Sequence, residues 1–270
     1  MFTPKELALE RGWPGRIEGD RVIQLAAQTL QSFFTGGGAA REHAEYALAD
    51  VALRPPVLRP PTVRDFMAFE EHVANTRRQR GSEVPQEWYE IPVFYFSNPA
   101  AVFGPDEEIP YPARTEELDY ELELAAVIGA EGQIGGFTVM NDWSARDLQR
   151  AEMKVGLGPS KGKDFATSLG PVLVTPDEFD GSEGTMVARV NGEERSRGRL
   201  ADMHHSWQAI RDHAARNTRL LPGDVLGSGT VGTGCILELG DGRWLQPGDV
   251  VELEIEGIGV LRNTVGPRAE

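Results

Sequence analysis

Residues 118–124 alternate apolar and acidic side chains, and this pattern limits the possible folds of the chain more than any other feature. The run reads Leu-Asp-Tyr-Glu-Leu-Glu-Leu, so a strand here places Glu121 and Glu123 on the same face of a sheet. Two neighbouring carboxylates repel each other unless a positive charge lies between them. Residues 125–128 are apolar and favour a strand buried on both faces, where unpaired acids are costly. The pattern therefore predicts a cation beside buried acids.

A third acid, Asp142, follows another run that favours a strand, residues 136–140. Ligand sites tend to lie at the ends of strands, and three carboxylates from two neighbouring segments form an oxygen-rich site that suits a hard divalent cation. Each acid also has a simpler interpretation. Alternating glutamates are common on exposed strands, and Asp142 equally suits the N-cap of a helix.

The overall charge of the chain excludes some classes of partner. Acidic residues outnumber basic ones by 42 to 27, which gives a formal net charge of −15. This balance argues against binding nucleic acid or an anionic membrane, because both need a basic surface. No apolar run approaches the ~20 residues of a membrane-spanning helix, and the first residues lack a signal-peptide pattern. With Cys235 as the single cysteine, no intrachain disulfide can form, and we expect a cytoplasmic protein.

The spacing of apolar residues predicts an α+β protein that is mainly β. Residues 21–34 have helical periodicity before a glycine run, which predicts a small, largely helical N-terminal portion over residues 1–54. The proline-rich residues 54–61 are typical of an extended connector, and residues 55–270 are interpreted as a β-rich catalytic domain. Helices are predicted over 62–80 and 205–216. Strands are predicted at 92–96, 118–128, 136–140, 171–175, 185–191, 234–239 and 250–256.

Four blocks of sequence, in order, resemble the fumarylacetoacetate hydrolase family. They are residues 118–123, residues 140–149, residues 161–165 and residues 227–230, and the second contains the specific run Asn-Asp-Trp-Ser-Ala-Arg-Asp. The resemblance runs from about residue 55 to residue 265 and is loose over the first fifty residues. It implies a mixed, mainly β roll around a metal site, a homodimer, and a Mg²⁺, Ca²⁺ or Mn²⁺ ion held by carboxylates.

The resemblance also implies the metal ligands and the acid-base pair. The positions that match metal ligands are Asp65, Glu121, Glu123 and Asp142. The catalytic histidine matches His72, and its spacing from Asp65 places both on one face of the predicted helix. The glutamate that orients this histidine matches Glu238. A carboxylate bonded to one ring nitrogen raises the basicity of the other, so that the imidazole can deprotonate water near neutral pH.

Further positions match the residues that contact the substrate in the family. Donors to the oxyanion match Arg146, Gln149 and Lys163, and loss of one such donor typically costs about 3 kcal/mol of transition-state stabilisation. Substrate-binding positions match Tyr95, Gly229 and Thr230. Two departures are Met67 and Met153, where the family has substrate-binding side chains, and residues 73–80 lack a clear match to its carboxylate-binding arginine. The substrate's carboxylates are therefore expected to be held differently.

The resemblance implies a metal-dependent hydrolase that cleaves a carbon–carbon bond in a β-diketo or acylpyruvate-type acid. Its expected partner is a small dicarboxylic keto acid, such as those formed in the catabolism of aromatic compounds. An alternative on the same fold is a decarboxylase or isomerase of oxaloacetate-like or hydroxydienedioate acids, because a fold does not fix a reaction. A non-enzymatic acidic scaffold with a structural ion is a third possibility.

Overall fold

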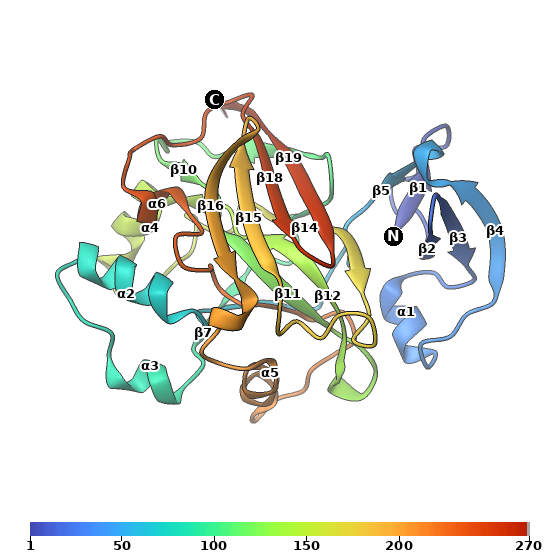
Figure 1. Ribbon diagram of the computed structural model, residues 1–270, viewed down its shortest axis with the longest axis horizontal. Coiled ribbons are helices and arrows are strands. Elements are labelled where there is room, and N and C mark those ends of the chain that lie inside the picture. Colours follow the sequence, from blue (N-terminus) through green and yellow to red (C-terminus); the bar gives the residue numbers. More distant parts are fainter. Residues whose placement is uncertain (269–270) are drawn as a thin grey trace.

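The computed structural model describes residues 1–268, which form a mainly β protein, as the sequence predicted (Figure 1). The α-helices are short: α1 (Leu30–Thr35), α2 (Glu70–Gln79), α3 (Gln86–Glu90), α4 (Arg146–Met153), α5 (Trp207–Ala215) and α6 (Ile236–Leu239). Single 3-10 turns are η1 (Leu48–Asp50), η2 (Ala130–Gly132) and η3 (Leu200–Asp202). Within residues 1–268, no helix has the length and apolar character needed to cross a membrane.

A seven-stranded sheet with the order β7-β6-β17-β11-β12-β14-β8 carries the acidic residues of interest. Its strands are β6 (Val63–Phe66), β7 (Phe94–Ser97), β8 (Val102–Phe103), β11 (Leu122–Ile128), β12 (Ile134–Asn141), β14 (Thr167–Val174) and β17 (Val225–Gly227). Strand β11 pairs antiparallel with β12, and Glu123 lies opposite Met140. Strand β17 runs parallel to β6, and Gly227 lies opposite Asp65. Segments far apart in the sequence are thus neighbours in this sheet.

A five-stranded sheet, ordered β16-β15-β18-β19-β9, contributes to the same hydrophobic core. Its strands are β9 (Glu108–Tyr111), β15 (Thr185–Val190), β16 (Glu193–Arg199), β18 (Val250–Ile255) and β19 (Gly259–Arg268). Leu122 and Leu124 of the first sheet share the core with Leu253 and Ile255 of the second, and all four are at most 1% exposed. Burying each such side chain stabilises the fold by roughly 1.5–3 kcal/mol, so this core fixes the relative position of the sheets.

The N-terminal portion is mainly β, so the prediction of a largely helical residue 1–54 segment is wrong. Strand β1 (Phe2–Pro4) pairs with β5 (Val51–Leu53), while β2 (Gly15–Glu18), β3 (Arg21–Leu25) and β4 (Glu42–Ala47) form a three-stranded sheet. In the helix predicted over 21–34, the first part is β3, because Val22 and Ile23 are β-branched and pair on both sides. The helix begins only after Thr29, whose side chain caps it.

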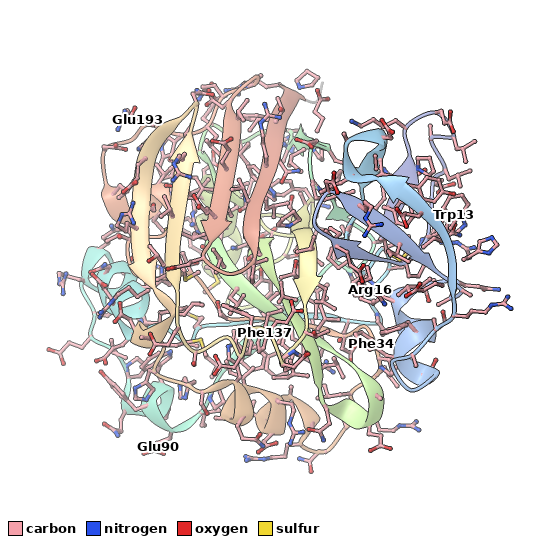
Figure 2. The ribbon with its side chains drawn as sticks, turned by 45° about the vertical axis from the view of Figure 1, so that its right-hand side comes forward. Trp13, Arg16, Phe34, Glu90, Phe137 and Glu193 are labelled. Carbon is pink, nitrogen blue, oxygen red and sulfur yellow. The ribbon has the colours of Figure 1, made fainter. Side chains whose placement is uncertain are left out.

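Helix α1 packs against the face of the seven-stranded sheet that lies away from the main core. Phe34 belongs to a second cluster with Ala125, Val127 and Val225, and Figure 2 shows it between α1 and the β11–β12 hairpin. A Cβ at Gly135 would lie 2.6 Å from the ring of Phe34, so the glycine lets the hairpin approach the helix. Strand β11 is therefore buried on both faces, as its apolar sequence predicted.

Three further predictions differ from the elements that the chain forms. The helix predicted over 62–80 is divided, because residues 63–66 form β6 between β7 and β17 and the helix begins at Glu70. The strand predicted at 234–239 is helix α6, which ends at Gly240 in a left-handed conformation. The predicted 118–128 strand is interrupted: β10 (Leu118–Asp119) pairs with β13 (Ser144–Ala145), and β11 begins at Leu122. The other predicted elements coincide with β7, β12, β14, β15, β18 and α5.

Candidate metal and acid-base site

Four acidic side chains from three segments meet beside the seven-stranded sheet. Asp65 lies on β6, Glu121 directly precedes β11, Glu123 lies on β11, and Asp142 directly follows β12. One carboxylate oxygen of each residue lies within 4.8 Å of those of the other three. None of the four residues is more than 5% exposed. The structure thus brings together all four residues that the sequence indicated as metal ligands, and we call them the carboxylate cluster.

The sheet register makes room for the carboxylate cluster. Gly227 lies opposite Asp65 on one neighbouring strand and opposite Ala125 on the other, and cross-strand partners share a face. A Cβ at Gly227 would lie 2.6 Å from Oδ1 of Asp65 and 2.9 Å from Oε2 of Glu123. The missing side chain is therefore what allows two acids from different strands to approach each other. Asp65 and His72 lie on a strand and a helix, not on the single helix that was predicted.

Two basic side chains balance one side of the carboxylate cluster. Nζ of Lys163 contacts Oε2 of Glu121 at 2.6 Å and also donates to Oδ2 of Asp142. Nη2 of Arg146 lies 2.8 Å from Oε1 of Glu121. Burial alone would raise the pKa of Glu121, but Lys163 and Arg146 hold this pKa below its usual range. Glu121 is therefore an ionised carboxylate.

The other side of the carboxylate cluster lacks such compensation. Among residues 1–268, no lysine or arginine lies within ion-pair distance of Asp65 or Glu123. Burial and repulsion from Asp142 raise the pKa of Asp65, and burial and repulsion from Asp65 raise that of Glu123. Oδ1 of Asp65 and Oδ1 of Asp142 are buried without a hydrogen-bond partner. An all-oxygen donor set with excess negative charge and unsatisfied oxygens fits a hard divalent cation.

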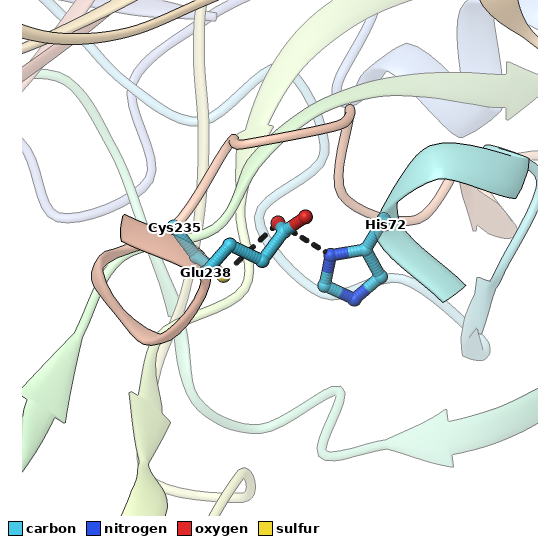
Figure 3. A group of neighbouring side chains, drawn as sticks. All are labelled: His72, Cys235 and Glu238. Carbon is cyan, nitrogen blue, oxygen red and sulfur yellow. Dashed lines mark hydrogen bonds and ion pairs between the residues drawn. The ribbon is translucent and has the colours of Figure 1, made fainter. Parts of the chain in front are cut away.

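A histidine and a glutamate form a second group near the carboxylate cluster. Nδ1 of His72 on α2 lies 2.7 Å from Oε2 of Glu238 on α6, and Figure 3 shows the other ring nitrogen facing away from the carboxylate. The side chain of His72 is 9% exposed and that of Glu238 is fully buried. Burial would raise the pKa of Glu238, but the bond to His72 keeps this pKa below its usual value. Buried contacts link the two groups, because Arg146 lies between Glu121 and Asp119 and the carboxylate of Asp119 accepts hydrogen bonds from the first N–H groups of α6.

The remaining residues expected from the sequence contact the carboxylate cluster or one another. Nη1 of Arg146 donates to Oε1 of Gln149 at 3.2 Å, so these two residues and Lys163 lie together. The hydroxyl of Tyr95 donates to Oδ2 of Asp142. The backbone N–H of Gly229 donates to Oε2 of Glu123 at 3.2 Å, and Oγ1 of Thr230 lies 3.4 Å from Oε1 of Glu123. The positions that matched substrate contacts therefore also hold acidic residues of the cluster.

Sequence reasoning gave no role to three residues that the structure places in these groups. Asp119 is fully buried and accepts hydrogen bonds from Nε of Arg146 at 2.8 Å and from the N–H of Ile236 at 2.7 Å. Its position two residues before Glu121 in the alternating run was the signal that could have identified it. Asn75 and Cys235 both contact Glu238. Their local sequences carry no comparable signal.

Comparison with known proteins gives matches over most of the chain. The family model described as fumarylacetoacetate (FAA) hydrolase C-terminal matches residues 62–266. Oxaloacetate tautomerase YisK of Bacillus subtilis (strain 168) is 30% identical over 269 residues, which cover 92% of this chain and 84% of that protein. The mitochondrial oxaloacetate tautomerase FAHD2A of Homo sapiens is 32% identical over 290 residues, which cover 96% and 87%.

Solved structures with the same fold have been named for several reactions. Fumarylacetoacetate hydrolase from Exiguobacterium antarcticum is 28% identical with a TM-score of 0.78, and the match covers 94% of this chain and 95% of that one. A 2-hydroxyhepta-2,4-diene-1,7-dioate isomerase from Mycobacterium marinum is 27% identical with a TM-score of 0.70 and coverage of 95% and 93%. A fumarylpyruvate hydrolase from Pseudomonas aeruginosa, in complex with Mn²⁺ and pyruvate, is 25% identical with a TM-score of 0.65 and coverage of 77% and 90%.

Proposed function

The chain belongs to the fumarylacetoacetate hydrolase family, and we propose that it is a metal-dependent tautomerase of an oxaloacetate-like dicarboxylic 2-oxo acid. The observation that carries this proposal is the buried carboxylate cluster next to a histidine that keeps one ring nitrogen free. The two relatives named as oxaloacetate tautomerases match nearly the full length of the chain, which favours this reaction over the hydrolysis expected from the sequence motifs. Hydrolysis becomes the second candidate.

The carboxylate cluster is proposed to hold the ion. A Mg²⁺ or Mn²⁺ ion held by Asp65, Glu121, Glu123 and Asp142 would polarise the keto group of the substrate and stabilise negative charge on its oxygen. The Mn²⁺ in a structural neighbour supports this choice of metal. The chain's own residues prepare the site, since Lys163 bridges two of the acids and fixes their direction.

His72 is proposed to move the proton. In the keto-to-enol direction, a C–H bond next to the keto group breaks and its electron pair forms the C=C bond. The π pair of the C=O bond moves to oxygen, which takes up the proton that the imidazolium of His72 returns, so the number of protons is unchanged. Nε2 of His72 is the acceptor of the C–H proton, because Nδ1 is bonded to Glu238. The carboxylate of Glu238 stabilises the imidazolium that forms. A positioned acid-base residue of this kind typically contributes about 10²- to 10⁴-fold to the rate.

The test follows the enol absorbance of oxaloacetate in the presence of Mg²⁺ or Mn²⁺. Purified protein should accelerate loss of the enol form without releasing CO₂ or pyruvate, and EDTA should abolish the acceleration. Decay no faster than in buffer, with either ion, would refute the tautomerase proposal. Release of CO₂ that keeps pace with the absorbance change would instead identify a decarboxylase.

The second candidate is hydrolytic carbon–carbon cleavage of an acylpyruvate. It is favoured by the same pair of residues, because a histidine oriented by a buried carboxylate can deprotonate a water molecule as well as a carbon acid. Fumarylpyruvate and a simple acylpyruvate are the appropriate substrates. Formation of two carboxylic acids in equal amounts would support hydrolysis, whereas absorbance loss without new acids would support tautomerisation.

Two properties of the whole chain are also proposed. We expect a homodimer, as the family resemblance implies, and light scattering of the purified protein measures it. We place the boundary of the catalytic domain at residues 54 and 55, after β5, where the chain leaves the N-terminal sheets. Expression of residues 55–270 with retained turnover would support this boundary. Loss of turnover in a folded fragment would show that the N-terminal portion belongs to the same functional unit.

A further inference from the structure

The carboxylate of Glu238 has more donors than its bond to His72 requires. Oε1 accepts hydrogen bonds from Nδ2 of Asn75 and from the backbone N–H of Thr233, each at 3.0 Å. Oε2 lies 2.7 Å from Nδ1 of His72 and 3.3 Å from Sγ of Cys235. Because the Glu238 side chain is fully buried, its charge depends on these partners rather than on water.

We propose that Asn75 and Cys235 are positioning residues that hold Glu238 against Nδ1 of His72 and thereby leave Nε2 as the proton acceptor. The catalytic consequence of this proposal rests on the proposed function. Asn75 follows His72 by three residues on α2, so both project from the same face of one helix towards Glu238. Cys235 immediately precedes α6, on which Glu238 lies. The carboxylate is therefore held from both helices.

The amide of Asn75 has a fixed orientation. Its Oδ1 accepts a hydrogen bond from Nη1 of Arg78 at 3.3 Å, so Nδ2 is the group that faces Glu238. If the carboxylate were free to rotate, Nδ1 of His72 would lose its acceptor and the neutral ring could carry its proton on Nε2 instead. A ring protonated on Nε2 cannot accept a proton there. The donors to Glu238 thus select the reactive form of His72.

Cys235 suits this position because it is a buried, protonated thiol. The residue is 0% exposed, and burial raises the pKa of its thiol well above the usual value, so that Sγ carries a proton to share with Oε2. The same three side chains could instead bind a metal ion. His72, Cys235 and Glu238 are close enough to ligate one metal ion, and a thiolate, an imidazole and a carboxylate are ligands that zinc accepts.

The experiment compares full-length variants in two independent measurements. The ¹⁵N spectrum of the His72 imidazole, recorded without added metal, should show the Nδ1-protonated tautomer in the natural protein. Asn75→Ala combined with Cys235→Ala should shift the population towards the Nε2-protonated form. Loss of a hydrogen bond to a charged group should lower kcat about tenfold for each alanine variant, while KM stays within about twofold. Cys235→Ser keeps a donor and should recover most of the loss.

Thr76→Val is the matched control for a lost polar group on α2. Its hydroxyl bonds only to backbone carbonyls of the same helix, so the variant should change neither the imidazole spectrum nor kcat. The proposal is overturned if the folded double variant keeps the natural tautomer, if Thr76→Val causes an equal effect, or if stoichiometric Zn²⁺ binds and Cys235→Ala removes it. Absence of turnover by the natural protein would refute the proposed function alone, because the spectrum still tests the positioning of His72.

Discussion

Replacing Gly227 by alanine should weaken metal binding strongly while it lowers the stability of the metal-free protein only slightly. The added Cβ would lie 2.6 Å from Oδ1 of Asp65, 2.9 Å from Oε2 of Glu123 and 2.9 Å from Cε of Met140. All three atoms are ends of side chains that can move. Gly227 does not have a positive φ, so alanine fits the backbone of β17. The steric conflict is therefore relieved by moving the side chains of Asp65 and Glu123, whose carboxylate oxygens are proposed metal ligands.

The loss of stability without metal and the loss of stabilisation by metal have different expected magnitudes. Overpacking costs about 1–3 kcal/mol, and alanine in a strand recovers roughly 0.5–1 kcal/mol relative to glycine, so the metal-free protein should lose only about 1 kcal/mol. An ion at 100 times its dissociation constant stabilises the natural protein by about 2.7 kcal/mol, which corresponds to a Tm increase of about 5–11 °C for a chain of this size. In Gly227→Ala we expect this increase to fall below about 2 °C, because the ligand oxygens are displaced.

Differential scanning calorimetry after dialysis against EDTA, with Mg²⁺ or Mn²⁺ added back, measures both quantities. Gly36→Ala is the matched control, because Gly36 has a φ of −80° and its nearest contacts are backbone carbonyls of α1. This control should keep the full metal-dependent increase in Tm. If Gly227→Ala also keeps it, the carboxylate cluster is not the metal site and the reasoning from its geometry fails.

Three further predictions address the charged residues. Glu238→Gln should lower kcat about 100-fold or more with little change in KM, because the neutral amide cannot stabilise a protonated imidazole. An unchanged kcat in steady-state kinetics would contradict this prediction. Lys163→Met leaves the buried Glu121 and Asp142 without their lysine partner, so it should destabilise the metal-free protein by about 3 kcal/mol in urea unfolding. An added divalent ion should restore part of this loss. An equal loss with and without the ion would argue against a cation beside these acids. Burial lowers the pKa of the His205 imidazole from 6.5 in the folded protein. Below pH 6.5 the imidazole therefore binds a proton more readily in the unfolded chain than in the folded one, and the protein loses stability as the pH falls towards the lowered pKa. His205→Gln should flatten the dependence of Tm on pH in that window. A slope equal to that of the natural protein would exclude a contribution from His205.

The acids of the site were accessible to sequence reasoning because their signal is local. An apolar-acidic alternation next to a continuous apolar run indicates buried charge, and buried charge needs compensation. Glu123 illustrates this, since β11 is buried along its whole length and the residue is 0% exposed. The motif around Asp142 then connected this run to a known family. The mainly β fold followed from the same resemblance and from the many short apolar runs separated by glycine and proline.

The remaining features depend on contacts between distant parts of the chain. The segment that begins at Arg21 has helical periodicity, but pairing with β2 and β4 makes it a strand. The local sequence does not predict these pairing partners. The sequence around Glu238 alternates as a strand does, yet forms helix α6. Asn75 and Glu238 are separated by 163 positions, so their hydrogen bond exists only once α2 and α6 have packed together. Hydrogen-bond partners of this kind are set by the tertiary fold.

Asp119 connects the two halves of the site and thereby limits where reaction specificity can arise. Its carboxylate accepts from Nε of Arg146, which reaches Glu121, and from the first N–H groups of α6, the helix that carries Glu238. The carboxylate cluster and the His72–Glu238 pair are therefore held by one continuous set of buried contacts. Both halves would serve the proposed tautomerisation and the alternative cleavage equally, because each reaction needs a polarised keto group and a positioned base. The choice between the reactions must then be made by residues that contact the rest of the substrate, so substitutions there, and not in the cluster, should change which product forms.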